Sequence, residues 1–305
     1  MRVFITGASG HIGSALVPEL IDNGHEVLGL ARSDRSAAIL ETAGAQVWRG
    51  DLDDLDGLQA AAKTADGVVH LAFKHEAMAS GDYLSAIADD FKAIQALTAV
   101  LEGTGKPFVG TGGTLMLALS GIQGRAGTEQ DVVTGGPRVE AENAIIGLGD
   151  RGVRTSLIRL SPIVHSSLDH HGFTHALIGI AQAKGVSAYV GDGANRWPAV
   201  HTLDAARLYR LALESAPAGS RLHGVADEGV PFREIAEVIG RRLNLPVTSI
   251  DQEDAGAHFG FLGNFAGVDN WTSSAGTRQL LGWEPTHPGL IDDLNHGHYF
   301  DKVTA

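Results

Sequence analysis

The chain begins with the stretch Arg2-Val3-Phe4-Ile5-Thr6-Gly7-Ala8-Ser9-Gly10-His11-Ile12-Gly13, in which a short apolar run leads into three regularly spaced glycines. An apolar segment with helical character follows at residues 14–21. In a strand–turn–helix unit, Gly7 permits a sharp turn, Gly10 lets backbone N–H groups approach a phosphate, and Gly13 lets the helix pack closely on the strand. The first N–H groups of such a helix lack acceptors within the helix and carry a partial positive charge. The stretch therefore predicts a turn that binds the pyrophosphate of a dinucleotide.

The composition is that of a globular protein without cysteine. The chain has 305 residues, 44% of them apolar, which is enough for one large or two modest domains. The absence of cysteine excludes disulfides, thiolate catalysis and cysteine-ligated metals. A formal net charge of -13 disfavours nonspecific binding to nucleic acid and to anionic membranes. The first strand is predicted to start at residue 2 and no apolar run approaches about 18 residues, so we expect a cytoplasmic protein without signal peptide or membrane span.

Strand and helix patterns alternate through the first half of the chain. Strands are predicted at residues 3–6, 26–31, 46–49, 67–72, 107–111 and 155–160, and helices at 14–23, 36–43, 55–62, 83–103 and 138–151. This βαβ alternation is typical of a parallel sheet with helices on both faces. The predicted fold class is therefore α/β, with a doubly wound Rossmann sheet.

The second half of the chain is less regular. Helices are predicted at residues 173–184, 203–215, 232–243 and 273–281, and strands at 187–190 and 246–251. This pattern predicts a smaller C-terminal α/β lobe over the edge of the sheet where ligands bind in open α/β folds. We therefore expect a dinucleotide-binding domain at residues 1–163, with residues 200–215 packing back on it, and a substrate-binding lobe at residues 164–305.

Five segments resemble motifs of the extended short-chain dehydrogenases/reductases, the branch that includes the NAD-dependent epimerases and dehydratases. The first is the glycine-rich turn, which is similar to the family's TGxxGxxG. The others, in chain order, are Asp51-Leu52, His70-Leu71-Ala72, residues 191–204 (GDGANRWPAVHTLD) and residues 281–285 (LGWEP). The resemblance covers nearly the whole chain. It implies a nicotinamide dinucleotide cofactor and a homodimer formed through the helices at 83–103 and 138–151, but it is a poor guide to the substrate.

The resemblance also implies where the cofactor binds. The pyrophosphate would bind at the glycine-rich turn, the adenine near Asp51, and the nicotinamide half near the ends of the fourth, fifth and sixth strands. The residues expected to bind it are Gly7, Ser9, Gly10, His11, Ile12, Gly13, Asp51, Leu52, Leu71, Ala72, Thr111, Arg138, Pro162 and Val164, together with Arg32 and Ser33, which are included for their charge and donor groups. Lys74 is added because it follows the fourth strand at the ligand-binding edge of the sheet, and its alternative is a solvated loop charge.

The end of the second predicted strand favours NADP over NAD. An acidic residue there accepts hydrogen bonds from the ribose hydroxyls of NAD, whereas a cation pairs with the extra phosphate of NADP. Ala31 occupies the place where the users of NAD carry Asp, and Arg32 and Ser33 follow it. The Arg32 guanidinium can form two parallel hydrogen bonds with a phosphate, and the Ser33 hydroxyl can donate another. NAD remains the alternative cofactor, because the Asp34 carboxylate can accept hydrogen bonds from a ribose if the turn is shifted.

The catalytic Tyr-x-x-x-Lys pair of this family is absent. None of the four tyrosines is followed by Lys four residues later. In the best register Arg138 falls on the Lys position, Thr134 on the Tyr position and Gly112 on the position of the family's Ser. Arg138 can hold ribose hydroxyls, but a guanidinium keeps its proton near neutral pH and is no acid.

Four side chains are candidates for polarising or protonating a substrate. Thr111 and Thr114 follow the fifth strand, where each hydroxyl can hydrogen-bond a substrate oxygen or instead satisfy the backbone at the strand end. His165 follows the sixth strand and His75 the fourth, which places both at the ligand-binding edge of the sheet. An imidazole can donate a proton near neutral pH. The alternative for both histidines is a surface or loop-anchoring role.

A histidine cluster raises the question of a metal. His171 and His175 are four residues apart, which is the spacing of a zinc pair on a helix, and His170 lies beside them. The helix is predicted to begin at Phe173, however, which leaves His171 outside it. Because no third ligand is evident apart from Asp169, no metal site is predicted.

Aromatic residues of the second half predict an apolar substrate pocket walled by Trp197, Phe259, Phe261 and Phe265, although core packing is the default for such residues. We therefore expect an NADP-dependent reductase that transfers hydride to a small or medium hydrophobic carbonyl, imine or conjugated alkene. One alternative is a catalytically silent NADP-binding redox sensor. Another is a nucleotide-sugar epimerase, for which Arg196 would suit the phosphate.

Overall fold

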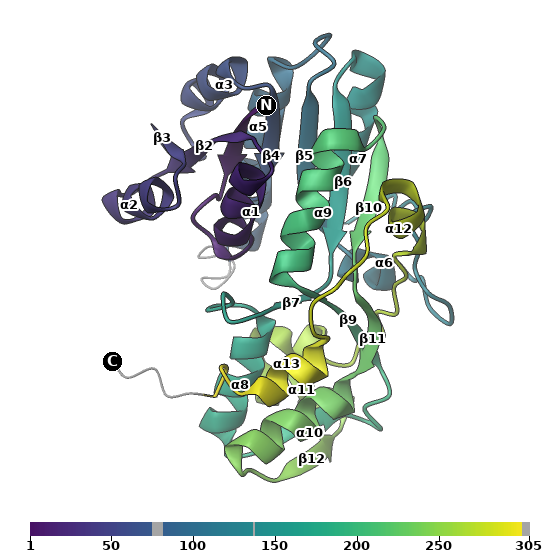
Figure 1. Cartoon of the computed structure of the whole chain (residues 1–305). Coiled ribbons are helices and arrows are strands. Elements are labelled where there is room, and N and C mark those ends of the chain that lie inside the picture. Colours follow the sequence, from purple (N-terminus) through teal and green to yellow (C-terminus); the bar gives the residue numbers. More distant parts are fainter. Residues whose placement is uncertain (75–81, 137, 301–305) are drawn as a thin grey trace.

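The computed structural model describes residues 1–74, 82–136 and 138–300, and within these ranges the main sheet has seven parallel strands (Figure 1). Their order across the sheet is β10-β6-β5-β4-β1-β2-β3. The strands are β1 (Arg2–Thr6), β2 (Glu26–Ala31), β3 (Gln46–Arg49), β4 (Gly67–His70), β5 (Pro107–Gly113), β6 (Arg154–Leu160) and β10 (Ser220–Gly224). The doubly wound α/β fold is thereby confirmed.

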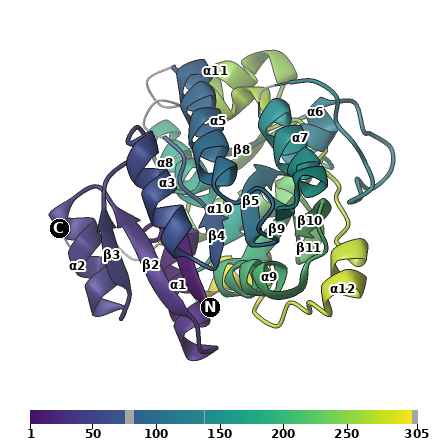
Figure 2. The ribbon, with the colours of Figure 1, turned by 90° about the horizontal axis from the view of Figure 1, so that it is seen from above.

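Helices cover both faces of this sheet. Helices α1 (His11–Asp22) and α9 (Thr202–Ser215) lie on one face, and α3 (Leu55–Thr64), α5 (Tyr83–Ala99) and α7 (Val139–Gly147) lie on the other (Figure 2). Helix α2 (Asp34–Thr42) packs beside β2 and β3. The carboxyl ends of the strands point toward the second lobe (Figure 1).

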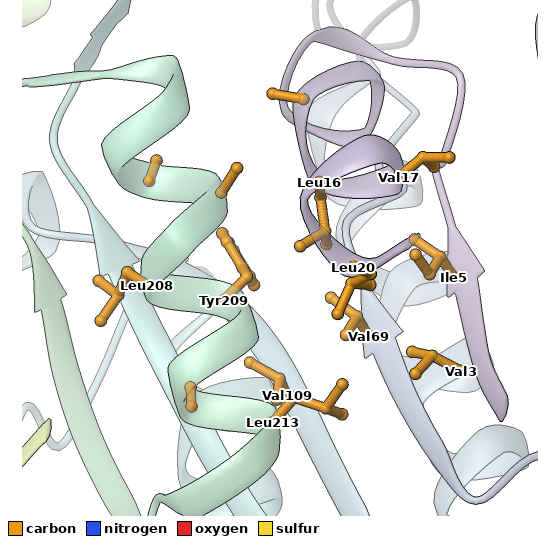
Figure 3. Packing of buried hydrophobic residues seen from close by; sticks show 14 of the residues in the cluster. Val3, Ile5, Leu16, Val17, Leu20, Val69, Val109, Leu208, Tyr209 and Leu213 are labelled. Atoms are coloured by element: carbon orange, nitrogen blue, oxygen red, sulfur yellow. The ribbon is translucent and has the colours of Figure 1, made fainter. Parts of the chain in front are cut away.

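Strand residues alternate between two apolar layers. Val3 and Ile5 join the layer under α1 and α9, whereas Phe4 joins the layer under α3, α5 and α7. Figure 3 shows Leu16 and Leu20 of α1 and Tyr209 of α9 in the first of these layers. Each such side chain is fully buried, and its removal from water contributes roughly 1.5–3 kcal/mol to folding.

The second lobe lies at the carboxyl ends of the main strands (Figure 1). Its described part has one sheet of β7 (Ile163–His165), β9 (Arg196–His201) and β11 (Asp227–Pro231), and another of β8 (Ser187–Val190) and β12 (Val247–Ile250). Its helices are α8 (Phe173–Lys184), α10 (Phe232–Leu243), α11 (Ala255–Phe259) and α13 (Leu290–His296), with 3-10 turns η2 (Gln252–Asp254) and η3 (Gly260–Asn264). Three further elements belong to the first domain or lie beside its main sheet. Helix α6 (Leu115–Leu119) follows β5, the turn η1 (Leu148–Arg151) contacts β6, and α12 (Ala275–Leu281) contacts β10.

The structure departs from the predicted elements in several places, since the strands β7, β9, β10 and β11 and the helices α6, α11 and α13 are not among those predicted. The expected helix at 138–151 is α7 followed by the 3-10 turn η1, and the helix expected to reach residue 103 ends at Ala99. Strand β10 was not predicted, because Ser220–Gly224 contains a single large apolar residue, Leu222. Its pairing with β6 supplies the backbone partners that its sequence pattern does not reveal. No helix among the described residues is long and apolar enough to cross a membrane.

Candidate functional site

The glycine-rich turn between β1 and α1 has no room for side chains. Gly7 has a φ of +71°, and a Cβ placed there would lie 2.7 Å from the backbone nitrogen of Ala72. A Cβ on Gly13 would lie 2.3 Å from the carbonyl oxygen of Gly7. Helix α1 begins at His11, so its first N–H groups, which lack helical acceptors, face this turn. The turn therefore fits the pyrophosphate of a dinucleotide.

The side chain of His11 connects this turn to the start of α9. Its Nε2 atom lies 2.7 Å from Oγ1 of Thr202, and burial lowers the pKa of His11. Ser9 and Ile12 are half-buried beside it, whereas Gly10 is exposed. The His11 imidazole thus packs toward the second lobe, which leaves its backbone N–H as the group that can meet a phosphate.

The carboxyl end of β2 carries basic and acidic side chains. Ala31 is buried, Arg32 is exposed, and the Ser33 hydroxyl caps α2 by accepting from the backbone N–H of Ser36. The Ser33 oxygen accepts this bond and lies 3.0 Å from the Ser36 hydroxyl, so the side chain that is expected to donate to a phosphate also caps the helix. The Asp34 carboxylate forms an ion pair with Arg49, which sequence reasoning missed.

The loop after β3 is held by its own carboxylates. Asp51 accepts hydrogen bonds from the backbone N–H groups of Asp53 and Asp54, and Leu52 packs into the core. The Lys74 ammonium lies 2.7 Å from carboxylate oxygens of both Asp53 and Asp89. Hydrogen bonds to these carboxylates raise the pKa of Lys74. Lys74 therefore joins this loop to α5, and its charge is already compensated.

Thr111 lies at the carboxyl end of β5 and is half-buried. Its hydroxyl donates to the backbone oxygen of His70 at 2.8 Å. Because the single proton of this hydroxyl is used there, the Tyr209 hydroxyl, 2.8 Å from Oγ1 of Thr111, is the donor in that second hydrogen bond. Sequence reasoning missed Tyr209, because it searched for a tyrosine by its spacing to a lysine.

Arg138 lies beside Thr111 in a strained backbone conformation. It has a φ of 67°, which is unusual for a residue other than glycine. Its Nη2 atom donates to the backbone oxygen of Thr111 at 3.2 Å and lies 3.7 Å from the buried carboxylate of Asp90. Its guanidinium also lies 4.3 Å from the centre of the Phe73 ring. Such strain is found at sites where surrounding contacts fix a functional side chain.

A buried chain of hydrogen bonds runs from β1 to Asp90. The His70 imidazole lies 2.7 Å from the Thr6 hydroxyl through Nδ1 and 3.1 Å from the Asp90 carboxylate through Nε2. A carboxylate accepts only, so Nε2 carries the proton and, in a neutral imidazole, Nδ1 accepts from Thr6. The Thr6 hydroxyl also accepts from the N–H of Ala72, which together with Leu71 is half-buried. These hydrogen bonds fix the position of the Asp90 carboxylate, beside which the Arg138 guanidinium lies.

Two predicted proton donors are enclosed by protein. Thr114 is fully buried, and its hydroxyl accepts from the side-chain amide of Asn270 at 3.1 Å. His165 is also fully buried, and its Nδ1 atom lies 2.8 Å from the Asp293 carboxylate. Neither side chain meets a substrate in this conformation, so the expectation of a direct role is corrected for both. His75 lies outside the described residues.

The predicted apolar pocket is filled by its own aromatic side chains. Trp197 and Phe259 are 0% and 3% exposed, and Phe265 packs against the same core. Phe261 is 58% exposed, and its ring centre lies 6.2 Å from that of Phe173. A cavity bordered by Phe259 has a volume of about 10 Å³, which is space for a single water. Trp197 and Phe259 are therefore core residues of the second lobe, where both rings pack against Phe232.

Other predicted positions differ in exposure. Pro162 and Val164, at the start of the second lobe, are half-buried, as is Gly112, whereas Thr134 is exposed. Arg196 donates through its Nε and Nη2 atoms to the carboxylate of Asp269, and these hydrogen bonds hold the pKa of Asp269 below its usual range.

Among the described residues, no three His, Asp or Glu side chains are grouped so that they could hold a metal ion. Helix α8 begins at Phe173, as expected, so His171 lies outside it. His175 instead hydrogen-bonds the backbone oxygen of Asp169 at 2.7 Å.

The comparisons with known proteins agree with this arrangement. The model of the NAD dependent epimerase/dehydratase family matches residues 3–115. An uncharacterized protein of Schizosaccharomyces pombe is 47% identical over 98% of this chain and 100% of its own length. The sterol-4-alpha-carboxylate 3-dehydrogenase of Dictyostelium discoideum is 28% identical over 76% of this chain and 74% of its own. The 2-alkyl-3-oxoalkanoate reductase of Stenotrophomonas maltophilia is 25% identical over 81% and 77%.

Solved structures share the fold at low identity. The UDP-glucose 4-epimerase of Thermotoga maritima superposes with a TM-score of 0.77 at 16% identity, covering 98% of each chain. The dTDP-glucose 4,6-dehydratase DesIV of Streptomyces venezuelae, solved with NAD, gives a TM-score of 0.76 at 19% identity, covering 98% of this chain and 96% of DesIV. Together with the glycine-rich turn, the match to the NAD dependent epimerase/dehydratase family model supports a nicotinamide dinucleotide cofactor. The chain belongs to the NAD-dependent epimerase/dehydratase family, within the extended short-chain dehydrogenases/reductases.

Proposed function

We propose that this protein is an NADP-dependent reductase that transfers hydride to a small or medium hydrophobic carbonyl, imine or conjugated alkene. The observation that carries the proposal is the meeting of Thr111 and Arg138 at the carboxyl end of β5. A hydroxyl and a fixed cation at this edge are the groups that a reductase needs beside a nicotinamide, and the tyrosine–lysine pair is not required to place them.

Each residue has a distinct role in this proposal. The bound dinucleotide supplies the hydride, and Arg138 holds ribose hydroxyls in place of a lysine. The Thr111 hydroxyl turns from the His70 carbonyl toward the substrate oxygen and polarises it as a hydrogen-bond donor, and the Tyr209 hydroxyl strengthens that donor through the hydrogen bond it already gives to Thr111. Burial raises the pKa of Tyr209, so Tyr209 keeps its proton, and the proton that the reduced product needs comes from water.

The names of two relatives support a hydrophobic substrate. One relative is named for a sterol and the other for a 2-alkyl-3-oxoalkanoate, and both names describe reactions at a carbonyl or the corresponding alcohol. The aromatic side chains of the second lobe, including the exposed Phe261, are compatible with an apolar ligand of that kind.

The nucleotide-sugar alternative would need a cation for the sugar-nucleotide phosphates. Arg196 was the candidate, but its guanidinium is neutralised by Asp269 and lies 4.3 Å from the centre of the Trp271 ring. The Asp269 carboxylate also accepts from the backbone N–H of Arg196, so it stays beside the guanidinium and would repel a phosphate there. Calorimetric titration with UDP-glucose tests the alternative, and we expect no binding.

The decisive experiment measures NADPH binding by fluorescence and then NADPH oxidation against aldehydes, ketones, imines and conjugated enones. Turnover of one hydrophobic class is the expected result. Tight NADPH binding without turnover of any class would instead support the silent redox sensor. A chain that binds neither NADPH nor NADH would overturn the proposal. Arg32→Ala is expected to weaken NADPH binding and leave NADH binding unchanged.

We also propose a homodimer. Helices α5 and α7 lie side by side on one face of the sheet, where the family resemblance implies the dimer contact (Figure 2). Analytical ultracentrifugation is expected to give twice the mass of one chain, and a monomer at all concentrations would contradict this expectation.

A further inference from the structure

Arg49 is the last residue of β3, and its backbone lies beside the end of β2. In the parallel pairing of these strands, Arg49 is the partner of Ala31. The end of the second strand is where doubly wound folds hold the adenosine ribose, and thus the 2′-phosphate of NADP. Arg49 therefore reaches the same location as Arg32, although the two residues are far apart in the sequence.

The Arg49 guanidinium is already arranged to hold an anion. Its Nη1 atom donates to the backbone oxygen of Ser33 at 2.7 Å, and Nη2 forms the ion pair with the Asp34 carboxylate. A planar guanidinium fork binds phosphate oxygens in the same way as carboxylate oxygens. The Asp34 side chain is 99% exposed, and exposed ion pairs are weak, so its carboxylate can leave Arg49 at little cost in free energy.

Several carboxylates follow Arg49 in the chain, and their negative charge favours a second cation beside a bound phosphate. Directly after Arg49 the chain carries the carboxylates Asp51, Asp53, Asp54 and Asp56. Lys74 forms an ion pair with Asp53, and the hydrogen bonds described for Asp51 and Asp54 come from backbone N–H groups. A 2′-phosphate held at this end of β2 by Arg32 alone would be repelled by these carboxylates, and the charge of the Arg49 guanidinium offsets that repulsion.

We propose that Arg49, together with Arg32, binds the 2′-phosphate of NADP, and that Asp34 occupies Arg49 until the phosphate displaces it. The inference rests on the proposed use of NADP. In this arrangement Asp34 does not bind a ribose as an NAD-type carboxylate would, because Arg49 draws it away and the phosphate then takes its place. Asp34 thus competes with the phosphate, and removing its charge strengthens NADP binding.

The test compares two probes that differ by the phosphate alone. Adenosine 2′,5′-bisphosphate and adenosine 5′-monophosphate are titrated calorimetrically into the wild type, Arg49→Gln and Asp34→Asn. Arg49→Gln is expected to weaken the bisphosphate about 10-fold, because a charge-assisted hydrogen bond is lost, and to leave the monophosphate unchanged. Asp34→Asn is expected to strengthen the bisphosphate. Lys63→Gln removes an exposed positive charge from the last turn of α3, which precedes the amino end of β4, and is the matched control.

The outcomes separate this inference from the cofactor proposal. Equal weakening of both probes by Arg49→Gln would mean a structural role and would overturn the inference, as would equal affinities of Arg49→Gln and the wild type for the bisphosphate. Thermal unfolding of each variant shows whether the fold is intact. A wild type that binds the bisphosphate no more tightly than the monophosphate would overturn both the inference and the preference for NADP.

Discussion

The Tyr209 hydroxyl donates a hydrogen bond to the Thr111 hydroxyl across 2.8 Å, although the two residues are 98 positions apart in the chain. The contact joins α9, which returns from the second lobe, to the carboxyl end of β5. Figure 3 shows Tyr209 on α9 among the apolar side chains of that layer. A buried phenol in this place supplies a hydroxyl to a family member that lacks the usual tyrosine.

Tyr209→Phe is expected to lower the free energy of unfolding by about 1 kcal/mol, because the Thr111 oxygen loses its buried donor. It should also lower turnover while leaving NADPH affinity unchanged. Urea unfolding and steady-state kinetics measure the two effects. Tyr189→Phe, on β8, is the control and should change stability by less than about 0.5 kcal/mol. Unchanged turnover in Tyr209→Phe would confine Tyr209 to a structural role.

Arg138 combines backbone strain with a proposed role in cofactor binding. Arg138→Gln should weaken NADPH binding about 10-fold, and Arg138→Lys should retain part of it, because the charge remains. Arg138→Gly also loses the guanidinium but relieves the left-handed backbone, so it should be more stable than Arg138→Gln by about 1 kcal/mol. Equal stability of the Gln and Gly variants in urea unfolding would contradict the strain.

Gly13→Ala tests the close packing of the glycine-rich turn. Its Cβ would lie 2.3 Å from the Gly7 carbonyl oxygen, so we expect a loss of more than about 2 kcal/mol of stability and of NADPH binding. Gly179→Ala in α8 is the matched control, since a Cβ there meets nothing within 4 Å. This control should gain about 0.5–1 kcal/mol from helix propensity. Native stability and NADPH affinity in Gly13→Ala would show that the turn is looser than described.

Two buried histidines predict a loss of stability in mild acid. Burial and the neighbouring His165 and His287 lower the pKa of His201 to about 4, and burial lowers that of His223 to about 4. Both values lie below the usual 6.5, so the unfolded chain binds more protons than the folded one, and stability falls as the pH drops from about 6.5 to about 4. Each histidine should cost about 2 kcal/mol between about pH 7 and about pH 5.

Urea unfolding at these two pH values measures the loss. His201→Asn is the informative variant, because an Asn side chain can replace the cap that His201 provides to α9 but does not titrate. In this variant the loss of stability between the two pH values should be smaller by the contribution of one histidine. The same loss in this variant as in the wild type would assign the acid sensitivity to other groups.

Much of the first half of the fold could be predicted from the sequence. Local patterns predicted three features: the turn from Gly7 to Gly13, the alternation of strands and helices, and the position where β2 ends. Each depends on backbone freedom and on apolar periodicity within a few residues. Strand β10 escaped prediction because its burial comes from pairing with β6 and not from its own pattern. The helix predicted at 138–151 is shorter in the structure, because its last turn tightens into the 3-10 turn η1.

The amino-acid sequence by itself determined the Rossmann sheet, the dinucleotide-binding turn and the family, because these follow from residues that are neighbours in the chain. The tertiary structure alone decided that Tyr209 meets Thr111, that Arg49 meets Asp34, and that Trp197 and His165 are enclosed. A side chain's exposure and partners depend on elements that arrive from elsewhere in the chain. A local pattern therefore indicates which residues can do chemistry, and packing selects among them.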